Sequence, residues 1–282
     1  MIDFIATDNA VETHYTRGNL ADAIRSGLKA LGKDTTDVTL DDLAPVDEFH
    51  IRGHAATLEL AQQLMISPDH HVLDVGSGLG GASRYLAQTY GCRVTGLDVT
   101  AEYCDVARLL AERLGLSSRV TYQHGNALNM PFEDATFDIV WTQHASMNIQ
   151  AKAQLYHEIA RVLKPEGVLA LYDVLAGPDG PAHLPAPWAG DASISFLITP
   201  EVLRSHLEQA GFRTLTWRDT TAAARDFFKQ LIERSRGQAG PPPLGLHLLV
   251  GANSAAIFEN MIRNLDENRI RLIETIQQKP AV

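Results

Sequence analysis

The stretch from His71 to Ala87, HVLDVGSGLGGASRYLA, constrains the fold of this chain more than any other part of the sequence. It begins with a short apolar, β-branched run that is typical of a strand buried on both faces of a parallel sheet. A glycine-rich turn follows from Gly76 to Gly81, and helical spacing resumes at Ala82. A strand, a glycine turn and a helix in this order let the backbone approach a nucleotide-containing ligand closely. The stretch therefore predicts the first unit of an α/β fold.

Two acidic residues indicate which ligand the turn favours, because the glycines alone fit both a dinucleotide fingerprint and a G-x-G-x-G pattern. Asp74 lies at the end of the strand, where a carboxylate meets a ligand's ammonium. Asp98 ends the next strand-like run, at the spacing where an acid accepts hydrogen bonds from ribose hydroxyls. S-adenosylmethionine has an ammonium and a ribose but no pyrophosphate, which Asp74 would repel. The pair predicts S-adenosylmethionine as the cofactor; the alternative is that either acid only caps or pairs locally.

Composition and charge exclude several classes of protein. The 282 residues suffice for one large α/β domain with an appended cap or for two small domains. A net charge of −10 argues against nucleic acid as a partner. No apolar run approaches the ~20 residues of a membrane span, and the first residues do not resemble a signal peptide. The two cysteines, Cys92 and Cys104, are expected to be reduced thiols of a cytoplasmic protein, and the scattered histidines predict no metal site.

Alternating strand and helix patterns predict a doubly wound, mostly parallel sheet of seven strands with right-handed crossovers. The expected strands are residues 72–75, 93–98, 119–123, 137–141, 168–174, 212–219 and 270–277, the last one antiparallel at the sheet edge. The expected domains are an N-terminal helical lid (1–52), a cofactor-binding core (53–220), a helical cap insertion (221–265) and the last strand of the core (266–282). The alternative for the first helices is that they only pack on the sheet edge.

Four motifs resemble those of class I S-adenosylmethionine-dependent methyltransferases. They are VLDVGSGLGG, GLDVT, GNALNMPFEDATFDIVWTQHASMNI and RVLKPEGVLALYDV, in this order. The resemblance covers about Asp47 to Asp219, and DEFHIRGHAATLELA, PAPWA and AGF are most similar to the sarcosine/dimethylglycine and related small-molecule methyltransferases. It implies a Rossmann-like methyltransferase fold with helical cap elements and a small-molecule acceptor.

The resemblance also implies roles for individual residues. Asp74 and Gly76 would hold the methionine end, Asp98 the ribose, and Asn126 the amino edge of adenine. The full set of expected cofactor contacts is Asp74, Gly76, Ser77, Gly78, Asp98, Val99, Asn126, Ala127, Leu128 and Gln143. Asn126 stands where an aspartate is frequent in the family, and Glu166 replaces a usual glycine in a turn. An asparagine still accepts a hydrogen bond from the adenine amine, so cofactor binding is expected to survive.

His144 is the candidate general base, because it follows the fourth strand and an imidazole titrates near neutrality. Asp173, at the end of the fifth strand, is expected to orient it. The candidate substrate contacts are Tyr15, His50, Met147, Phe227 and Phe228. The alternatives are that His144 only positions the backbone and that Tyr15 is structural.

The expected function is methyl transfer from S-adenosylmethionine to a small molecule, with an amine nitrogen favoured because the nearest resemblance is to amine methyltransferases. Two alternatives remain open for the acceptor: C-methylation or O-methylation of a natural-product or quinone-like metabolite, with His144 as base. A nucleotide-dependent oxidoreductase would share the glycine turn, but Asp74 and the NALNMPF segment speak against it. A binding protein without catalytic activity is a further class. Neither nucleic acid nor a membrane is an expected partner, and the protein is expected to be a monomer or a homodimer.

Overall fold

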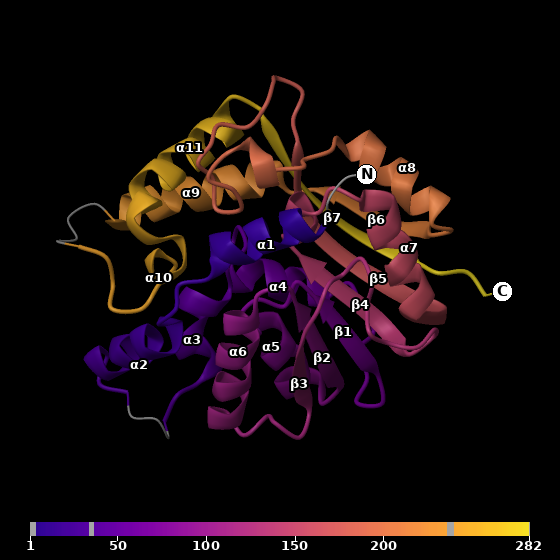
Figure 1. The fold of residues 1–282 in the computed structure, drawn as a ribbon, viewed down its shortest axis with the longest axis horizontal. Coiled ribbons are helices and arrows are strands. Elements are labelled where there is room, and N and C mark those ends of the chain that lie inside the picture. The colour runs from indigo at the N-terminus through magenta and orange to yellow at the C-terminus, as the bar shows by residue number, and fades with distance from the viewer. Residues whose placement is uncertain (1–3, 34–36, 236–239, 282) are drawn as a thin grey trace.

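The computed structural model describes residues 4–33, 37–235 and 240–281, which form an α/β fold around one seven-stranded sheet (Figure 1). The strands are β1 (His71–Val75), β2 (Arg93–Asp98), β3 (Val120–His124), β4 (Phe137–Gln143), β5 (Leu163–Ala176), β6 (Arg213–Asp219) and β7 (Ile270–Gln278). Their order across the sheet is β3-β2-β1-β4-β5-β7-β6. The neighbouring strands from β3 to β5 pair in parallel. β7 runs antiparallel to both of its neighbours, β5 and β6. The predicted doubly wound, mostly parallel sheet is confirmed.

The last strand lies inside the sheet, which corrects the expectation that it forms the edge. β7 pairs with β5 on one side and with β6 on the other. Nearly all of its residues are buried, whereas most residues of β6 are exposed or half-buried. An inner strand needs side chains that tolerate burial on both faces, and an edge strand tolerates charge. The threonines and arginines of β6 therefore suit the edge better than the isoleucines of β7.

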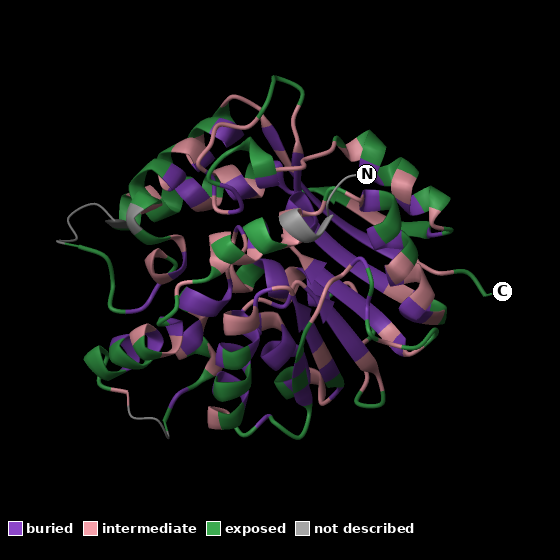
Figure 2. Ribbon diagram, viewed as in Figure 1, coloured by how far each residue is buried: buried purple, intermediate pink, exposed green. Residues whose placement is uncertain are grey.

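Helices cover both faces of the sheet (Figure 1). Successive side chains of a strand point to opposite faces, so Val72 joins one apolar cluster and Leu73 the other. The cluster on the first face includes residues of α4 (His54–Ala61), α5 (Gly81–Tyr90), α6 (Ala101–Arg113), α9 (Thr221–Ser235) and α11 (Ser254–Asp266). The cluster on the second face includes residues of α7 (Lys152–Val162) and α8 (Pro200–Gln209). Figure 2 shows the resulting buried centre of the sheet.

Two helical segments that are far apart in the sequence pack against each other. The first comprises α1 (Phe4–Tyr15), α2 (Leu20–Ala30) and α3 (Leu40–Asp47), and the second includes α10 (His247–Val250) between β6 and β7. A third apolar cluster joins Ile24 and Leu28 of α2 to Leu249 of α10. Gly27 permits this approach, because a Cβ there would lie 2.5 Å from the Pro243 carbonyl oxygen. The N-terminal helices and the insertion thus form one covering layer.

The connection from α7 to β5 differs from the expected turn. β5 begins at Leu163 and includes Lys164, Pro165 and Glu166, which the sequence assigns to a turn before residue 168. Glu166 has a φ of +64°, in the left-handed region that favours glycine.

None of the described helices is long and apolar enough to cross a membrane.

Candidate active site

The turn between β1 and α5 is shaped by glycines with positive φ. The φ angle is +74° at Gly76, +54° at Gly78 and +80° at Gly80. A Cβ added at Gly76 would lie 2.5 Å from the side chain of Ala145, whereas one added at Gly78 would meet no protein atom within 4 Å. The Gly76 N–H donates to the Leu97 carbonyl at 2.8 Å, which ties the turn to β2. Gly78 therefore presents bare backbone to open space.

A cavity opens beside this turn, at the carboxyl ends of β1, β2 and β4. It encloses about 1110 Å³ of space, part of which is its open mouth. Doubly wound sheets bind ligands at this edge. The residues of its wall that the sequence singled out are Tyr15, His50, Asp74, Gly76, Ser77, Gly78, Asp98, Val99, Asn126, Ala127, Gln143 and His144. The sequence-predicted residues therefore converge on one site, with the exceptions described below.

Asp74 is a buried carboxyl in the cavity wall. It is 3% exposed, and the Ser83 hydroxyl donates a hydrogen bond to its Oδ2 at 2.6 Å. Burial raises the pKa of Asp74 to about 7, and the nearby carboxylates of Asp98 and Glu48 act in the same direction. A cationic group in the cavity would restore the charged form, because an opposite charge at short range lowers a carboxyl pKa. The site thus fits an ammonium.

Asp98 lies beside three polar side chains that lack partners. Its carboxylate accepts the N–H groups of Gly78 and Thr100, each at 2.8 Å. Ser77 Oγ, Thr100 Oγ1 and the Tyr103 hydroxyl belong to residues of the cavity wall, are enclosed, and have no hydrogen-bond partner among the described residues. Buried polar atoms without partners are rare in native proteins unless a ligand or water satisfies them. A polyhydroxyl ligand such as a ribose would satisfy this group.

Thr100 and Tyr103 are site residues that sequence reasoning missed. In the sequence they stand before and on the inner face of a helix, which favours a cap and a core residue. The structure shows that Thr100 is the N-cap of α6 but that its side chain makes no capping hydrogen bond. Its place in the cavity wall beside Asp98, and not the sequence position, identifies Thr100 as part of the candidate site.

The amide of Asn126 is already engaged by protein atoms. Its Oδ1 accepts the Leu128 N–H at 2.7 Å, and its Nδ2 donates to Oδ2 of Asp8 at 2.5 Å. Asp8 belongs to α1 and lines the cavity, and burial raises its pKa. A carboxyl group therefore lies beside Asn126, and it comes from Asp8 of the N-terminal helix and not from residue 126 itself. Leu128 itself is buried in the second-face cluster and is not among the residues of the cavity wall, so its contact with adenine stays a prediction.

The N-terminal helix is fastened across the cavity by Tyr15. The Tyr15 hydroxyl donates to Oδ1 of Asn148 at 2.8 Å, and both residues line the cavity. Asn148 Nδ2 donates in turn to the carbonyls of Trp188 at 2.7 Å and Ile194 at 2.8 Å. Tyr15 thus connects α1 to the proline-containing loop after β5, and the structure gives this candidate substrate contact a place in the wall.

His144 lies in the wall with a defined tautomer. Its backbone has a φ of +50°. Its Nδ1 accepts the Ile51 N–H at 3.4 Å, and its Nε2 is enclosed without a partner among the described residues. Burial and the neighbouring His50 hold the pKa of His144 well below its usual value, so the ring is neutral. Since Nδ1 accepts, the single proton of the neutral ring resides on Nε2.

The expectation that Asp173 orients His144 is wrong with respect to hydrogen bonding. Asp173 accepts the N–H groups of Ser146 at 3.1 Å and Val174 at 2.9 Å. Alternate residues of a strand point to opposite faces, and the ring that packs on His144 is that of the preceding residue, Tyr172, with centroids 4.7 Å apart. Asp173 instead holds the short helix at residues 146–148, and burial raises its pKa to about 6.

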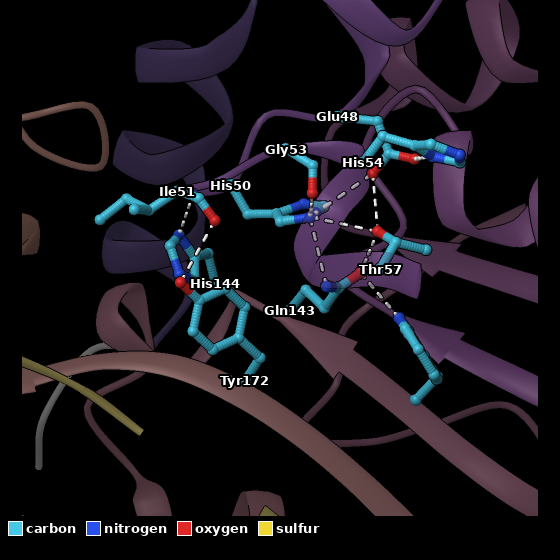
Figure 3. Close-up of polar contacts among 10 residues, drawn as sticks. Glu48, His50, Ile51, Gly53, His54, Thr57, Gln143, His144 and Tyr172 are labelled. Atoms are coloured by element: carbon cyan, nitrogen blue, oxygen red, sulfur yellow. Dashed lines mark hydrogen bonds and ion pairs between the residues drawn. The ribbon is translucent and has the colours of Figure 1, made fainter. Parts of the chain in front are cut away.

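A second histidine, His50, belongs to a polar cluster at the same end of the cavity (Figure 3). Its Nε2 lies near Gly53, Thr57, Gln143 and Glu48. Glu48 Oε2 accepts the Thr57 hydroxyl at 2.8 Å, and Oε1 is 3.0 Å from Nδ1 of His54. Burial alone would raise the pKa of Glu48, but its contacts with His54, His50 and Thr57 outweigh burial and lower it. Glu48 is therefore a charged carboxylate.

Three candidate substrate contacts lie outside the cavity wall. Met147 is buried among apolar residues, and its carbonyl accepts the Phe196 N–H at 2.8 Å. Phe227 and Phe228 of α9 stack edge to face, and Phe228 also packs on Phe258 of α11. Phe228 lies in the interface between α9 and α11, and Phe227 is half-buried beside it, so their expected role in substrate binding is not supported by their positions. Among the described residues of the insertion, Leu249 of α10 is the one that lines the wall.

The charged residues of the wall are acidic. They are Asp8, Asp47, Glu48, Asp74 and Asp98. Asp47 pairs with the fully buried Arg84, which is not part of the wall and also donates to the Leu79 carbonyl at 2.6 Å. Among the described residues, no lysine or arginine lines the cavity, and no cluster of metal-ligating side chains is found. The cavity therefore attracts cations and offers an anion no side-chain ammonium or guanidinium.

Comparison with known proteins supports the sequence resemblance. A family model described as a methyltransferase domain matches residues 73–171. The chain is 27% identical to a sarcosine/dimethylglycine N-methyltransferase of Halorhodospira halochloris, over 92% of the chain and 90% of the relative. It is 28% identical to a glycine/sarcosine/dimethylglycine N-methyltransferase of Actinopolyspora halophila, over 75% of the chain but only 37% of that relative. An O-methyltransferase, resE of Aspergillus sclerotiorum, is 29% identical over 78% of the chain and 83% of the relative.

Solved structures share the fold at lower identity. A phosphoethanolamine N-methyltransferase of Haemonchus contortus, in complex with S-adenosyl-L-methionine, has a TM-score of 0.71 at 20% identity, over 91% of this chain and 60% of that one. A geranyl diphosphate C-methyltransferase of Streptomyces coelicolor, in complex with S-adenosyl-L-homocysteine, has a TM-score of 0.65 at 18% identity, over 80% of each chain. The proteins similar to this chain thus include methyltransferases named for nitrogen, carbon and oxygen acceptors.

Proposed function

Because this chain is a class I S-adenosylmethionine-dependent methyltransferase of the group that includes the sarcosine/dimethylglycine N-methyltransferases, we propose that it methylates the nitrogen of a small amine that bears no carboxylate or phosphate. The observation that carries this proposal is the acidic character of the cavity. Its wall has carboxyl groups beside the glycine turn, and the described residues of the wall include no lysine or arginine.

Residues on three neighbouring strands would hold the cofactor. The sheet order β2-β1-β4 puts Asp98, Asp74 and Gln143 side by side at one edge. In the bound state Asp98 would accept the ribose hydroxyls and Asp74 the ammonium of the methionine end, while Gly78 gives the backbone room. Asp8 would face the adenine amine beside Asn126. The bound cofactor supplies a methyl group on a sulfonium, which is an activated leaving group.

The order of these strands also indicates where the acceptor binds. If the ribose lies over β2 and the methionine end over β1, the wall beyond β1 is formed by Gln143 and His144 after β4 and by His50. Alignment of the acceptor there is the main requirement for in-line displacement, and alignment alone supplies about 7–11 kcal/mol in favourable cases. Tyr15 and Asn148 close this end and would exclude water.

The charge of the acceptor follows from the wall. Glycine, sarcosine and dimethylglycine carry a carboxylate, which needs a cationic or strong donor partner when it is removed from water. The described wall has no lysine or arginine for it, and the carboxylate of Glu48 would repel it. A cationic amine would be attracted by the same carboxylate. We therefore propose an acceptor without the carboxylate of the amino acids in the relatives' names.

O-methylation or C-methylation is the second candidate function. It is favoured by the enclosed Nε2 of His144, which has no partner among the described residues and would hydrogen-bond an acceptor oxygen. In the tautomer described above this nitrogen donates, so it would bind a carbonyl or a hydroxyl oxygen rather than remove a proton.

A cytoplasmic location is part of the same proposal. Both cysteines, Cys92 and Cys104, are free and buried, as expected of reduced thiols. Burial raises the pKa of Cys92 to about 11 and that of Cys104 to about 12, so neither is a reactive thiolate at neutral pH.

A panel of acceptors tests the proposed reaction. The purified protein and S-adenosylmethionine are incubated with matched compounds that differ in one group: a primary amine, the same amine with a carboxylate, the corresponding alcohol and an acidic carbon compound. S-adenosylhomocysteine release is measured, and the product is identified by mass spectrometry. We expect turnover with the uncharged-tail amine and at least ten-fold lower kcat/KM for its carboxylate analogue. Preference for the carboxylate analogue, or for the alcohol, would overturn the assignment of the acceptor.

A further inference from the structure

We propose that His50, supported by the carboxylate of Glu48, is the group that takes the proton from the acceptor's ammonium. The proposal rests on the proposed N-methylation and identifies a different histidine from the one that the sequence favours. Both residues lie between α3 and α4, at the end of the cavity where Gln143 and His144 also lie (Figure 3).

The surroundings of His50 Nε2 define which ring nitrogen bears the proton. The Thr57 hydroxyl oxygen lies 3.2 Å from Nε2 and donates its hydrogen to Glu48. The nearest acceptor is the carbonyl oxygen of Gly53 at 3.0 Å, and a carboxylate oxygen of Glu48 lies at 3.4 Å. Both oxygens can only accept hydrogen bonds. A lone pair on Nε2 would face two acceptors, one of them charged, so Nε2 carries the proton of the neutral ring.

Gln143 is the competing neighbour of the same nitrogen. The Trp141 indole N–H, which can only donate, lies 2.9 Å from Gln143 Oε1 and fixes the orientation of the amide. The amide nitrogen then lies 3.2 Å from His50 Nε2. This distance exceeds that from Nε2 to the Gly53 carbonyl oxygen, and the Glu48 carboxylate is a second acceptor near the same nitrogen. We therefore infer that the two acceptors, and not the one donor, determine the protonation of Nε2. Gln143 keeps its N–H groups for a ligand in the cavity.

The other ring nitrogen of His50 is available to a ligand. Nδ1 makes no hydrogen bond to any described residue, and it is not among the enclosed polar atoms without partners. His50 lines the cavity, and Nδ1 is its ring nitrogen that no described residue engages, so in the Nε2–H tautomer Nδ1 carries a free lone pair. His144 differs in both respects, because its Nδ1 accepts the Ile51 N–H and its Nε2 is enclosed. His50 is therefore the histidine of the described wall that has an accessible basic nitrogen.

Glu48 supplies the charge that an imidazolium at His50 requires. Glu48 is 4% exposed and is held by Thr57 and His54, so its position is fixed. The other charged or titratable groups around His50 are His54 of α4, Arg52 of the same loop, His144 after β4 and Tyr172 of β5, whose ring centroid lies 6.2 Å from that of His50. Arg52 is paired with Glu59. Burial lowers the pKa of His50 and Glu48 opposes this change, so the ring is neutral before reaction and stabilised after it gains a proton.

The proton transfer balances without any further reagent. One N–H bond of the acceptor's ammonium breaks, its electron pair stays on the nitrogen as the lone pair, and the proton bonds to His50 Nδ1. The positive charge moves to the imidazolium, whose Nε2–H faces Glu48. The lone pair then forms the N–C bond to the transferred methyl group while the C–S bond breaks with its pair on sulfur. The imidazolium returns its proton to water after product leaves.

Substitution of His50 tests its role in turnover. With an amine acceptor, His50→Gln is expected to lower kcat by about 10²–10⁴-fold at neutral pH, which is the range for loss of a general base. The loss should shrink as pH rises toward the acceptor's own pKa, because a larger share of the amine then arrives deprotonated. His157→Gln is the matched control: it makes the same chemical change on the exposed side of α7, outside the cavity wall, and should leave kcat unchanged. A pH-independent loss in His50→Gln would assign the residue a structural role and overturn the proposal.

A second measurement does not depend on activity. Nitrogen-15 NMR of the histidine rings reports tautomer and pKa in the folded protein. We expect the Nε2–H tautomer at His50, and a lower pKa of His50 in Glu48→Gln while the melting temperature shows that the variant is folded. An Nδ1–H tautomer, or no change of the His50 pKa in Glu48→Gln, would overturn the inference. If the NMR results agree but no amine is methylated, the proposed function fails and the properties of the pair remain.

Discussion

The backbone N–H of Gly78 donates a hydrogen bond to Oδ2 of Asp98 over 2.8 Å, and this contact joins the glycine turn after β1 to the acid at the end of β2. The second oxygen of Asp98 accepts the Thr100 N–H at the start of α6. Asp98 thus does two things: it shapes the turn and leaves lone pairs for a ribose. Its substitution is expected to act on cofactor binding through both.

Asp98→Ala is expected to weaken binding of S-adenosylhomocysteine by ten-fold or more while the protein stays folded. A hydrogen bond to a charged group contributes about 1.5–3 kcal/mol, and each 1.4 kcal/mol is about ten-fold in affinity. Titration calorimetry measures the dissociation constant, with Asp105→Ala, an exposed acid of α6, as the control. Unchanged affinity in Asp98→Ala would remove Asp98 from the ribose site.

Asp74 is expected to release a proton when the cofactor binds. The folded protein holds this proton up to a pKa of about 7, whereas the unfolded chain loses it near 3.8. The folded state therefore binds more protons across this window, and the free energy of unfolding of the ligand-free protein falls as pH rises through it. A bound ammonium lowers the pKa again, so about half a proton should leave at pH 7. Calorimetry in two buffers of different ionisation enthalpy measures this number. Asp74→Asn should abolish the buffer dependence, and its persistence would contradict the prediction.

The N-terminal helix, and not α9, is expected to respond to the cofactor. Asp8 and Tyr15 of α1 line the cavity, whereas Phe227 and Phe228 of α9 do not. A lid that closes over a site orders when the ligand is present. Hydrogen exchange with and without S-adenosylhomocysteine should show added protection in α1 and little change in α9. Tyr15→Phe removes the hydrogen bond to Asn148 and should reduce the protection of α1. Protection confined to α9 would restore the two phenylalanines as site residues.

His144→Ala is expected to lower turnover of an amine acceptor by ten-fold or less. The ring is neutral and its one proton is on the enclosed Nε2, so its loss removes a hydrogen-bond donor and not the base. Since burial and His50 hold the pKa of His144 well below 6.5, no fall in rate near that pH should come from this residue. The measurement is kcat against pH for wild type and variant. A loss of about 10²–10⁴-fold would instead identify His144 as the base and favour an oxygen or carbon acceptor.

Glu166→Gly is expected to stabilise the protein by up to about 1 kcal/mol. A non-glycine residue with left-handed φ carries a cost of roughly 1–3 kcal/mol, part of which is offset because glycine loses more backbone entropy on folding. The φ of +64° at Glu166 meets this condition. Urea unfolding compares the variant with wild type, and Glu133→Gly, an exposed acid in the loop before β4, serves as a control for the loss of a surface charge. A destabilised Glu166→Gly would show that the residue has a role in β5 pairing.

The sequence by itself determined the sheet and the part of the site that lies at the carboxyl ends of its strands. Apolar runs of strand length, helical spacing between them and the glycines after Val75 are local patterns, and local patterns are what single-sequence reasoning detects. Asp74 and Asp98 lie at the ends of strands and Gly78 lies in the turn after the first of them. Parallel strands end at the same edge of the sheet, so the convergence of these residues follows from the alternation alone. The same reasoning put Gln143 and His144 at this edge, where the structure has them.

Only the tertiary structure decided which side chains meet across long sequence separations. Asp8 reaches Asn126, and Asn148 joins Tyr15 to Trp188, through packing of the covering helices that no local spacing encodes. The aromatic rings of α9 suited a ligand or a core equally well in the sequence, and the packing of α9 on α11 buried Phe228 in the core and left Phe227 half-buried beside it. The two histidines of the wall show the same principle. Their residue type is visible in the sequence, but the free nitrogen of each is fixed by its neighbours in space: Gly53 and Glu48 for His50, Ile51 for His144.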